Sequence, residues 1–348
     1  MEGSFKGNLA VPGRILYIKG NFRMNHLKAW GAMAGKTVRT VIVAMALLVP
    51  AAGVAAGSAT IFNFLRNDVG ARAAALAGSF TTMQGDPDIL FYNPAGLATI
   101  HTSIGSAGFF KHLMDINAGY VTYSTDVPGV GRFGAGIVYT NYGTFDQTDE
   151  LGSTTGTFGA GDLALSIGYA LPVDENVYLG GALKGIYSSI GPYSSSGVAA
   201  DLGVLYTIPA SRFAIGASIR NLGMQLSKYG SISEDLPLDC GIGASIVPKG
   251  LPLLLNVGVH RLNDDAPDFV SRFRSFTVGG EFQLSKVVMA RVGYDNARRK
   301  DYKIGSSAGL AGFSAGLGIL VSGYTFDYAL SSLGKAGNLH RISIRTTF

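Results

Sequence analysis

The sequence predicts an all-β fold: a transmembrane antiparallel β-barrel of about 14 strands with a short helical N-terminal plug. Three observations predict it: a secretory leader, a ladder of short alternating runs, and a last strand that ends in Phe348. In that strand Ile342, Ile344 and Phe348 share one face, whereas Arg341 and Arg345 share the other. This period of two is typical of a strand between lipid and a wet lumen. We therefore interpret Phe348 as the assembly signal of the barrel.

Most of the basic excess of the chain lies in residues 1–56. This segment holds seven of the 28 Lys and Arg and one of the 23 Asp and Glu, so 21 cations and 22 anions remain. A nearly neutral mature chain gives no electrostatic reason to expect nucleic acid as a partner. The single cysteine, Cys240, excludes a disulfide and a cysteine metal site within the chain.

Residues 1–56 also have the order of a signal peptide. Cations come first, an apolar core follows at 41–49, and small residues at 54–56 form a cleavage site. We expect the leader to start at Met24 and the mature chain to begin near Gly57. The alternative is a transmembrane anchor, but the apolar core is shorter than the roughly 20 residues that a spanning helix needs.

Short alternating runs fill the chain from about residue 101 onward. In one of them Phe213, Ile215 and Ile219 alternate with Arg212 and Arg220. Turn residues separate the runs, and an even number of runs is expected for a bacterial barrel. The predicted strands are 101–110, 115–125, 130–141, 158–170, 175–189, 194–207, 211–221, 236–247, 252–262, 271–285, 287–296, 304–318, 321–331 and 338–348.

Two other folds would account for parts of this pattern. A soluble β-sandwich also alternates, but only 15% of the chain is charged, which is little for a large soluble all-β surface. Low-complexity disorder would explain the 49 glycines, but aliphatic and aromatic residues are interleaved among them. We favour glycines that face the lumen and make room inside a narrow barrel.

Residues 57–98 break the alternation and are predicted to form the plug, with the barrel at 99–348. The stretch 70–80 is rich in alanine and favours a helix. Asp86-Pro87 is a helix start, with Asp as the N-cap and Pro at the first helical position. Asn93-Pro94 ends that helix and begins another turn. We expect this segment to fold into the lumen.

The plug segment also carries a family resemblance. Its motif consists of Gly70, Arg72, Asp86, Asp88, Asn93, Pro94 and Gly96. Together with the stretches at 219–223, 323–329 and 340–343, this motif resembles the PorV/PorQ outer-membrane proteins, relatives of the FadL-type long-chain fatty-acid transporters. The resemblance implies a plugged barrel of 14 strands in the cell outer membrane, with membrane lipid and the barrel-assembly machinery as partners.

The resemblance implies two possible roles. One branch of the family resembles components or shuttles of type IX protein secretion, and its partners would be secretion components or secreted cargo. This role is our first expectation. The alternative is a FadL-like transporter, whose ligand would be a hydrophobic small molecule that leaves through a lateral opening.

Several glycine motifs match the spacing of catalytic or cofactor-binding motifs, and the histidines are candidate catalytic residues. We nevertheless predict no enzyme and no catalytic, cofactor or metal site. The segment 129–134 has dinucleotide-binding spacing but runs into a strand instead of a helix. The segments 305–309 and 312–316 match a lipase elbow without its strand-to-helix context. We expect satisfied lumen or loop side chains at the mature histidines His101, His112, His260 and His340.

Hairpin register predicts two charge pairs in the lumen. The pairs are Lys184 with Asp201 and Asp327 with Arg341. The first pair assumes a turn centred between Pro192 and Tyr193, and the second a turn centred on Gly334. Directly opposed side chains approach within reach of an ion pair and help to fix register. The alternative is unrelated, solvated side chains.

Overall fold

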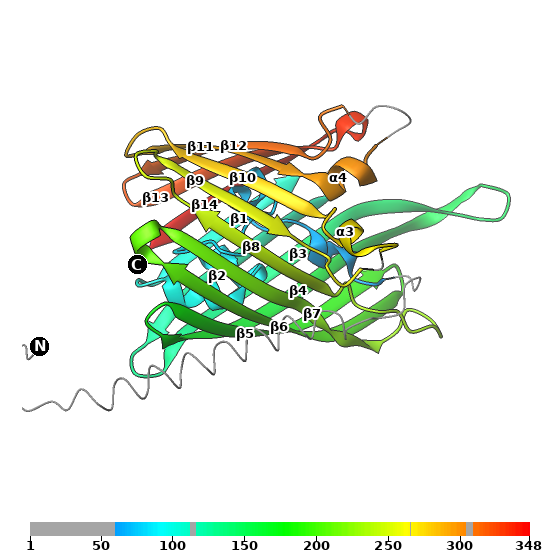
Figure 1. Cartoon of the computed structure of the whole chain (residues 1–348). Coiled ribbons are helices and arrows are strands. Elements are labelled where there is room, and N and C mark those ends of the chain that lie inside the picture. The colour runs from blue at the N-terminus through cyan, green and yellow to red at the C-terminus, as the bar shows by residue number, and fades with distance from the viewer. Residues whose placement is uncertain (1–59, 112–115, 265, 304–308) are drawn as a thin grey trace, which may run out of the picture.

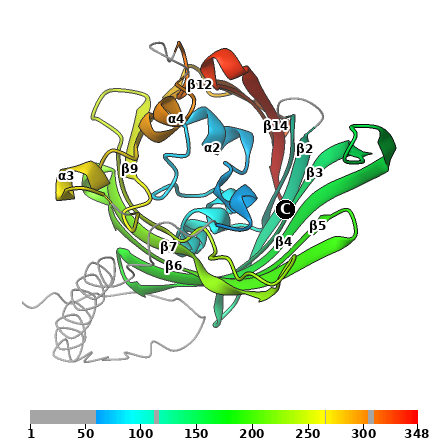
Figure 2. The same ribbon diagram turned by 90° about the vertical axis from the view of Figure 1, so that its right-hand side faces the viewer.

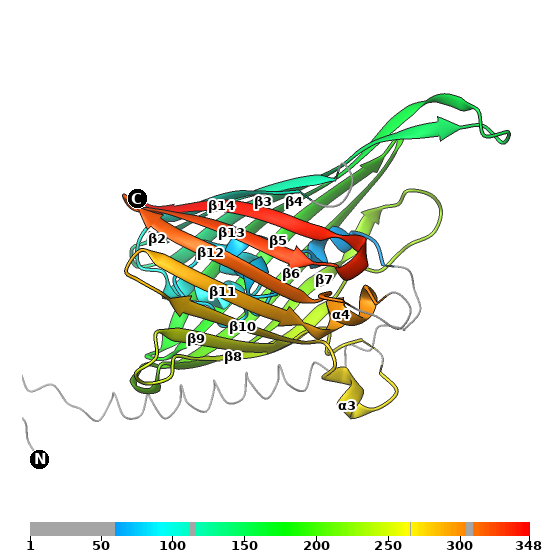
Figure 3. The same ribbon diagram turned by 90° about the horizontal axis from the view of Figure 1, so that it is seen from above.

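The strands form one closed antiparallel barrel of 14 strands, so the predicted fold class is confirmed. Each strand pairs with its neighbours in sequence, and β1 pairs with β14. Figure 1 shows the tilted strands from the side, and Figure 3 shows them from above. The computed structural model describes residues 60–111, 116–264, 266–303 and 309–348. The predicted leader therefore lies outside the described residues.

The observed strands match the predicted runs in number and order. They are β1 (Ile104–Lys111), β2 (Asn117–Val127), β3 (Gly131–Thr148), β4 (Thr154–Asp174), β5 (Val177–Ile190), β6 (Tyr193–Ile208), β7 (Phe213–Ser227), β8 (Asp239–Ile246), β9 (Leu253–Val259), β10 (Phe276–Gln283), β11 (Val288–Asp295), β12 (Phe313–Val321), β13 (Tyr324–Ser332) and β14 (Asn338–Thr347). Short helices η4 (Pro209–Ser211), α3 (Phe269–Arg272), α4 (Asn296–Asp301) and η5 (Gly334–Ala336) lie in the connections.

The two ends of the barrel differ. One end carries α3, α4 and the extended hairpin of β3 and β4, and we name it the long-loop end (Figure 1). The other carries short turns and Phe348, and we name it the short-turn end. The β3–β4 hairpin is longer than predicted. Its Thr-rich extension lacks the apolar alternation on which the prediction relied, and stacking of Phe145 on Phe158, with ring centroids 5.5 Å apart, supports the extension instead.

The predicted strand at 304–318 begins too early. The described part of this stretch forms a turn at 309–312, and β12 starts only at Phe313. The preceding helix α4 is capped by Asp295, whose side chain accepts hydrogen bonds from the backbone N–H groups of Ala297 and Arg298. Gly-rich sequence blurred the period here, so the strand start was wrong.

The outer face of the barrel is apolar. Leu183 is 71% exposed and Ile167 is 67% exposed, whereas the lumen-facing Ala182 and Ser166 beside them are buried. The same alternation runs through most strands, as in the first ten residues of β3. An apolar outer face with a polar or small inner face is the arrangement that a lipid-embedded barrel requires.

Residues 60–100 lie inside the barrel (Figure 2). They contain η1 (Asn63–Arg66), α2 (Ala71–Ala75), η2 (Pro87–Phe91) and η3 (Pro94–Thr99). As predicted, Asp86 caps η2 by accepting from the N–H of Asp88. Asn93, which was predicted only to end that helix and begin another turn, also caps η3 by accepting from the N–H of Ala95. No helix in the described part of the chain is long and apolar enough to cross a membrane.

Lumen-facing glycines receive the plug. A Cβ atom on Gly203 would lie 1.9 Å from Asn93 Oδ1, and one on Gly180 would lie 2.4 Å from the backbone nitrogen of Ala95. Similar close contacts to the plug occur at Gly134, Gly136, Gly168, Gly216, Gly279, Gly293 and Gly316. These glycines make room inside the barrel, and the room is taken by the plug.

Candidate functional site

Six charged side chains join the plug to the barrel wall in a closed ring. In order, this charge ring consists of Arg72, Glu281, Arg291, Asp327, Arg345 and Asp86. Arg72 and Asp86 belong to the plug, and the other four come from β10, β11, β13 and β14. Three arginines alternate with three carboxylates, so their charges compensate one another.

Most of the ion pairs in the charge ring are short, both those made by the plug residues and those between wall residues. Arg72 donates two hydrogen bonds to Glu281, of 2.8 and 2.7 Å, and a third of 2.9 Å to Asp86. Arg291 lies 2.6 Å from both Glu281 and Asp327. Arg345 bonds to Asp86 and lies 3.9 Å from Asp327. Bidentate, buried arginine–carboxylate contacts of this kind are the strongest hydrogen bonds in proteins.

Asp88 lies among hydroxyl groups of the barrel wall, next to the charge ring. Its carboxyl group accepts hydrogen bonds of 2.7 Å from both Tyr120 and Thr122, and one of 3.3 Å from Ser106. Burial and the nearby charge of Asp86 raise the pKa of Asp88 to about 7. Burial also acts to raise the pKa of Asp86, but Arg345 and Arg72 outweigh it and hold that pKa below its ordinary value.

The remaining plug-motif residues position this contact surface. Asn93 donates to the backbone oxygens of Thr81, at 2.9 Å, and Val204, at 3.0 Å. Gly70 has a φ of 85° and lies against Asp88, while Gly96 lies against Ile89. Pro94 occupies the first turn of η3. The structure therefore brings all seven motif residues into one packed plug.

Lys184 and Asp201 meet in the lumen, but they are not directly opposite. Lys184 Nζ lies 2.7 Å from Asp201 Oδ2, and both side chains are buried. The predicted register is wrong by two residues, since Lys184 pairs with Ala199 and Asp201 with Ala182. The turn consists of Gly191 and Pro192, because Gly191 supplies the positive φ of 56° at its first position.

Asp327 and Arg341 do not form the predicted pair. Asp327 lies opposite Ser343, and Arg341 lies opposite Ala329. The hairpin reverses through η5, which centres the turn one residue beyond Gly334 and shifts every pair by two. Asp327 belongs to the charge ring instead, and Arg341 lies over the ring of Phe110 at 5.6 Å.

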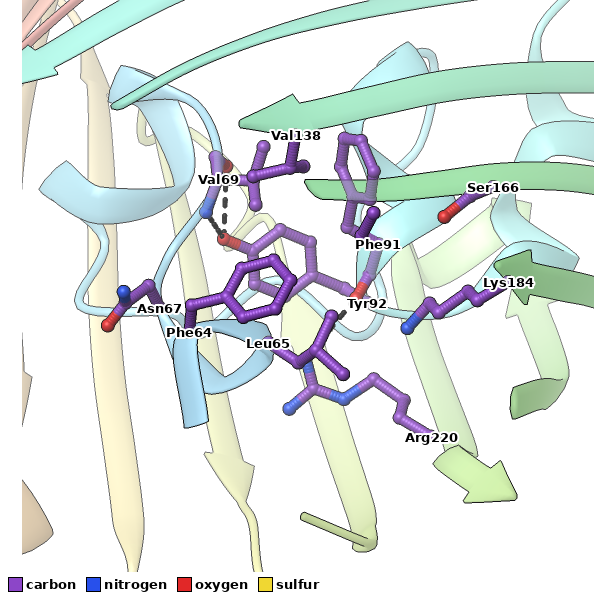
Figure 4. Close-up of a pocket in the computed structure, with 11 residues that line it drawn as sticks. Phe64, Leu65, Asn67, Val69, Phe91, Tyr92, Val138, Ser166, Lys184 and Arg220 are labelled. Atoms are coloured by element: carbon purple, nitrogen blue, oxygen red, sulfur yellow. Dashed lines mark hydrogen bonds between the residues drawn. The ribbon is translucent and has the colours of Figure 1, made fainter. Parts of the chain in front are cut away.

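A small pocket lies between the plug and strands β3, β4, β5 and β7. We name it the inner pocket; its volume is about 20 Å³, which is room for about one water molecule. Figure 4 shows Tyr92 beside Phe64 and Phe91, with the Tyr92 hydroxyl bonded to the backbone of Val69. The lining residues are Phe64, Leu65, Asn67, Val69, Phe91, Tyr92, Val138, Ala164, Ser166, Lys184 and Arg220.

An apolar cluster continues from the inner pocket toward the long-loop end. Its plug members are Ile61, Phe62 and Phe64, its wall members are Ala164, Ile186 and Ala199, and Leu236 joins it from the connection between β7 and β8. The plug segment 61–64 therefore fills an apolar part of the lumen with its own side chains.

The wall beside this apolar cluster is irregular. The ladder between β3 and β4 skips Tyr142 and Gly143, and Gly143 has a φ of 83°. A groove of about 650 Å³, which we name the wall notch, lies around this bulge, and Asp162 lines it. The hydroxyl of Tyr142, in the bulge, donates a 2.6 Å hydrogen bond to Asp162.

A further cavity, larger than the inner pocket, lies at the long-loop end between the plug and α4. We name it the vestibule; its volume is about 430 Å³. Five of its lining residues are arginines: Arg66, Arg220, Arg261, Arg298 and Arg341. Four are aspartates: Asp68, Asp239, Asp295 and Asp301. The vestibule is therefore a polar compartment; it borders the inner pocket, with which it shares Asn67, Tyr92 and Arg220.

The histidines are dispersed. His101 is exposed, His340 contacts the hydroxyl of Tyr328 at 2.8 Å, and His260 lines the vestibule. His112 and most of the 305–309 motif lie outside the described residues. Among the described residues, no group of three or more His, Cys, Asp or Glu could hold a metal ion. Ser314 of the 312–316 motif lies within β12 and donates to Ser331, so this motif has no elbow geometry.

The sequence analysis missed three members of the charge ring, namely Glu281, Arg291 and Arg345. Each is a charged residue on the polar face of a predicted strand. Because only 15% of the chain is charged, a charged residue on the polar face of a strand is uncommon. This position could therefore have been used to predict these three lumen charges. The vestibule was missed as well, since its lining comes from the plug, strand ends and loops.

The comparisons with known proteins identify the fold. No family model and no curated protein matches the chain. The toluene transporter TodX of Pseudomonas putida matches with a TM-score of 0.56 at 14% identity, over 80% of this chain and 96% of that chain. The toluene transporter TbuX of Ralstonia pickettii matches with a TM-score of 0.55 at 12% identity, over 80% and 98%.

A FadL homologue of Pseudomonas aeruginosa also matches, with a TM-score of 0.52 at 10% identity, over 80% of this chain and 98% of that chain. At such identities the likeness shows the fold alone. It supports the FadL side of the family resemblance and leaves the PorV/PorQ side a prediction. The chain therefore has the barrel fold of the FadL-type outer-membrane transporters.

Proposed function

We propose that this chain is an outer-membrane channel for hydrophobic small molecules. The observation that carries the proposal is the position of the wall notch beside the apolar cluster of the lumen. Asp162 in the notch and Ala164 in the cluster are successive lumen-facing residues of β4. A molecule held in the cluster would therefore lie next to an irregular part of the wall, where the β3–β4 ladder is interrupted. The solved toluene transporters of the same fold support this proposal.

A lateral route suits an apolar molecule. The plug and the charge ring fill the lumen with compensated charges, and an apolar solute would have to pass them to cross axially. A solute that leaves sideways through the notch moves from the apolar cluster directly into lipid. It therefore avoids the cost of removing polar groups of the lumen from their partners. We infer that the Tyr142–Asp162 hydrogen bond closes this route.

A small-molecule site of ordinary size forms here only if part of the plug moves. The inner pocket is far smaller than the roughly 300–1,000 Å³ of typical small-molecule sites. Phe62 and Phe64 fill the neighbouring apolar space and are both buried. We infer that the segment 61–64 occupies the ligand site and that an apolar ligand displaces it.

Uptake of toluene by cells that make the protein tests the proposal. Deleting Gly143 removes the extra residue of the bulge, and we expect it to reduce the uptake rate of radiolabelled toluene severalfold. Deleting Glu150 and Leu151 at the hairpin tip is the matched control and should leave uptake unchanged. Equal uptake with and without the protein, or with and without the bulge, would contradict the proposal.

The secretion role remains a second candidate. The observation that favours it is the β3–β4 hairpin, which projects beyond the barrel and exposes 91% of Leu151 at its tip (Figure 3). Isolation of the protein from native membranes tests this role. Co-purification of secretion components that is lost when the hairpin tip is deleted would favour secretion over transport.

A further inference from the structure

Arg341 is a buried cation that forms no ion pair within the part of the chain that the structure describes; the carboxylate that attracts it, Asp68, is paired with Arg298. Arg341 projects from β14 into the vestibule and is 2% exposed. Within the described residues, Arg341 donates a 3.3 Å hydrogen bond to Ser331 Oγ, and its guanidinium lies over the ring of Phe110. Its Nε atom is buried without a hydrogen-bond partner there. An uncompensated buried charge is costly unless an opposite charge reaches it.

Three more side chains present unpartnered polar atoms to the same cavity. Among the described residues, both ring nitrogens of His260, Oγ1 of Thr277 and Nη1 of Arg298 are buried without partners. Gly241 and Gly258 make room for the His260 ring, since a Cβ atom on either would lie within 3.3 Å of a ring nitrogen. Four residues from separate elements thus leave polar groups, mostly donors, free at one cavity.

The carboxylates of the vestibule are already engaged. Asp68 pairs with Arg298 at 2.6 Å, and Asp239 pairs with Arg220. Asp295 caps α4 and lies 3.7 Å from Arg298. The five lining arginines exceed the four lining aspartates by one charge, and the buried arginine left over is Arg341.

We propose that the vestibule binds a small oxyanion, the carboxylate or phosphate group of a polar solute, with Arg341 as its charged ligand. An oxyanion accepts several hydrogen bonds at once and supplies the charge that Arg341 lacks. Arg298, Thr277 and His260 provide further donors around it. Charged and polar residues make up most of the vestibule lining, so the site suits a polar anion and differs from the apolar inner pocket.

Water alone would not meet the same need. A cavity of about 430 Å³ holds many water molecules, and these satisfy donors such as Thr277. Water cannot neutralise the charge of Arg341, whereas an anion does both. This proposal is independent of the transport function, because it uses none of the residues of the wall notch.

Calorimetric titration of the full-length chain in detergent micelles tests the proposal. Inorganic phosphate and acetate are titrated separately at one ionic strength, which distinguishes a phosphate ligand from a carboxylate ligand. We expect saturable binding of at least one of them at one site per barrel. Arg341→Met should weaken that binding by about tenfold or more, since it removes a charge-assisted contact.

Arg132→Met is the matched control. Arg132 is also a buried lumen arginine without a carboxylate in an ion pair among the described residues, but it lies at the short-turn end and bonds to Ser124. We expect its variant to bind like the parent chain. Thr277→Val keeps the charge and volume and should weaken binding severalfold, so it decides the matter if Arg341→Met does not fold. Absence of saturable binding of both anions would overturn the proposal. So would an affinity equal to that of the parent chain in the Arg341→Met and Thr277→Val variants.

Discussion

At the scale of single residues, buried lumen charges are held by more than their ion partners. Lys184 donates a 2.8 Å hydrogen bond to Asn221 as well as contacting Asp201. Asp201 accepts a 2.8 Å hydrogen bond from the backbone N–H of Asn221. Asn221 therefore orients both charges, and its φ of 59° fixes the backbone that allows this.

A double-mutant cycle on Lys184→Met and Asp201→Leu measures this pair. Each single change leaves a buried charge unpaired and should lower the free energy of unfolding by about 3–5 kcal/mol. The double variant should lose less than the sum, with a coupling of about 1–3 kcal/mol. Urea unfolding in micelles gives the four values. Strictly additive losses would show that the contact contributes nothing.

Asp88 gives the plug a pH dependence. Because its pKa is about 7 in the folded chain and lower when unfolded, the folded state favours the protonated form. Its contribution to stability is complete below the unfolded pKa and is lost as the pH rises through about 7. We expect the unfolding midpoint to fall between pH 5 and pH 8, and Asp88→Asn to flatten this slope. An unchanged slope in that variant would assign the dependence to another group.

Gly180 and Gly185 provide a matched test of how the plug is seated. Both lie in β5, but a Cβ atom on Gly180 would meet plug backbone at 2.4 Å, and one on Gly185 would meet nothing within 4 Å. Gly180→Ala should destabilise the barrel by about 1–3 kcal/mol through overpacking. Gly185→Ala should be close to neutral. Equal urea midpoints for the two variants would show that the plug is seated loosely.

At the scale of elements, the plug depends on the wall for its shape. Its helices have only four to six residues each, too short to be stable alone in water. Caps at Asp86 and Asn93 begin two of them, and the wall glycines and the charge ring hold them in place. The plug is therefore a folded part of the barrel interior.

Deleting residues 70–97 should open the lumen. Because this stretch carries two members of the charge ring and the caps of η2 and η3, we expect higher single-channel conductance in planar bilayers. Deleting Glu150 and Leu151 at the hairpin tip should leave conductance at the parent level. If both deletions give the parent conductance, the plug does not control the pore.

The elements were more predictable than their register. Alternation and turn residues predicted fourteen strands in the observed order, because a barrel wall between lipid and lumen imposes a period of two, but they misplaced the start of β12 and missed the outer part of the β3–β4 hairpin. Register depends on which turn residue adopts a positive φ, and assigning the first hairpin turn to Pro192 and Tyr193 moved every pair by two. A shift of two keeps each residue on its face, which is why Lys184 and Asp201 still meet. The charge ring joins six segments distant in sequence, so no local pattern predicts it.

At the scale of the whole molecule, Phe348 lies where the barrel closes. Its backbone N–H donates a 2.8 Å hydrogen bond to the oxygen of Ser103, and its ring centroid lies 6.0 Å from that of Tyr123. Its side chain is 77% exposed on the outer face. Few contacts hold it in the folded chain, so its role as an assembly signal stays a prediction.

Phe348→Asp should slow assembly with little effect on the finished barrel. We expect less heat-modifiable, folded protein in outer-membrane fractions shortly after induction, and near-parent urea midpoints for the part that folds. Phe145→Asp, at an exposed ring of the hairpin, is the control and should assemble at the parent rate. Equal assembly rates for the two variants would remove Phe348 as the signal.

The contact of the plug with the last strand couples the start of the chain to its end. Arg345 bonds to Asp86 across 259 residues, and the backbone N–H of Ala71 bonds to Ser343 across 272. Contacts of such long sequence separation form late, because a long loop must close first. The charge ring is therefore complete only when both the plug and β14 are in place. Because Arg345 belongs to β14, loss of the last strand would remove one of the two arginines that hold Asp86 in the plug.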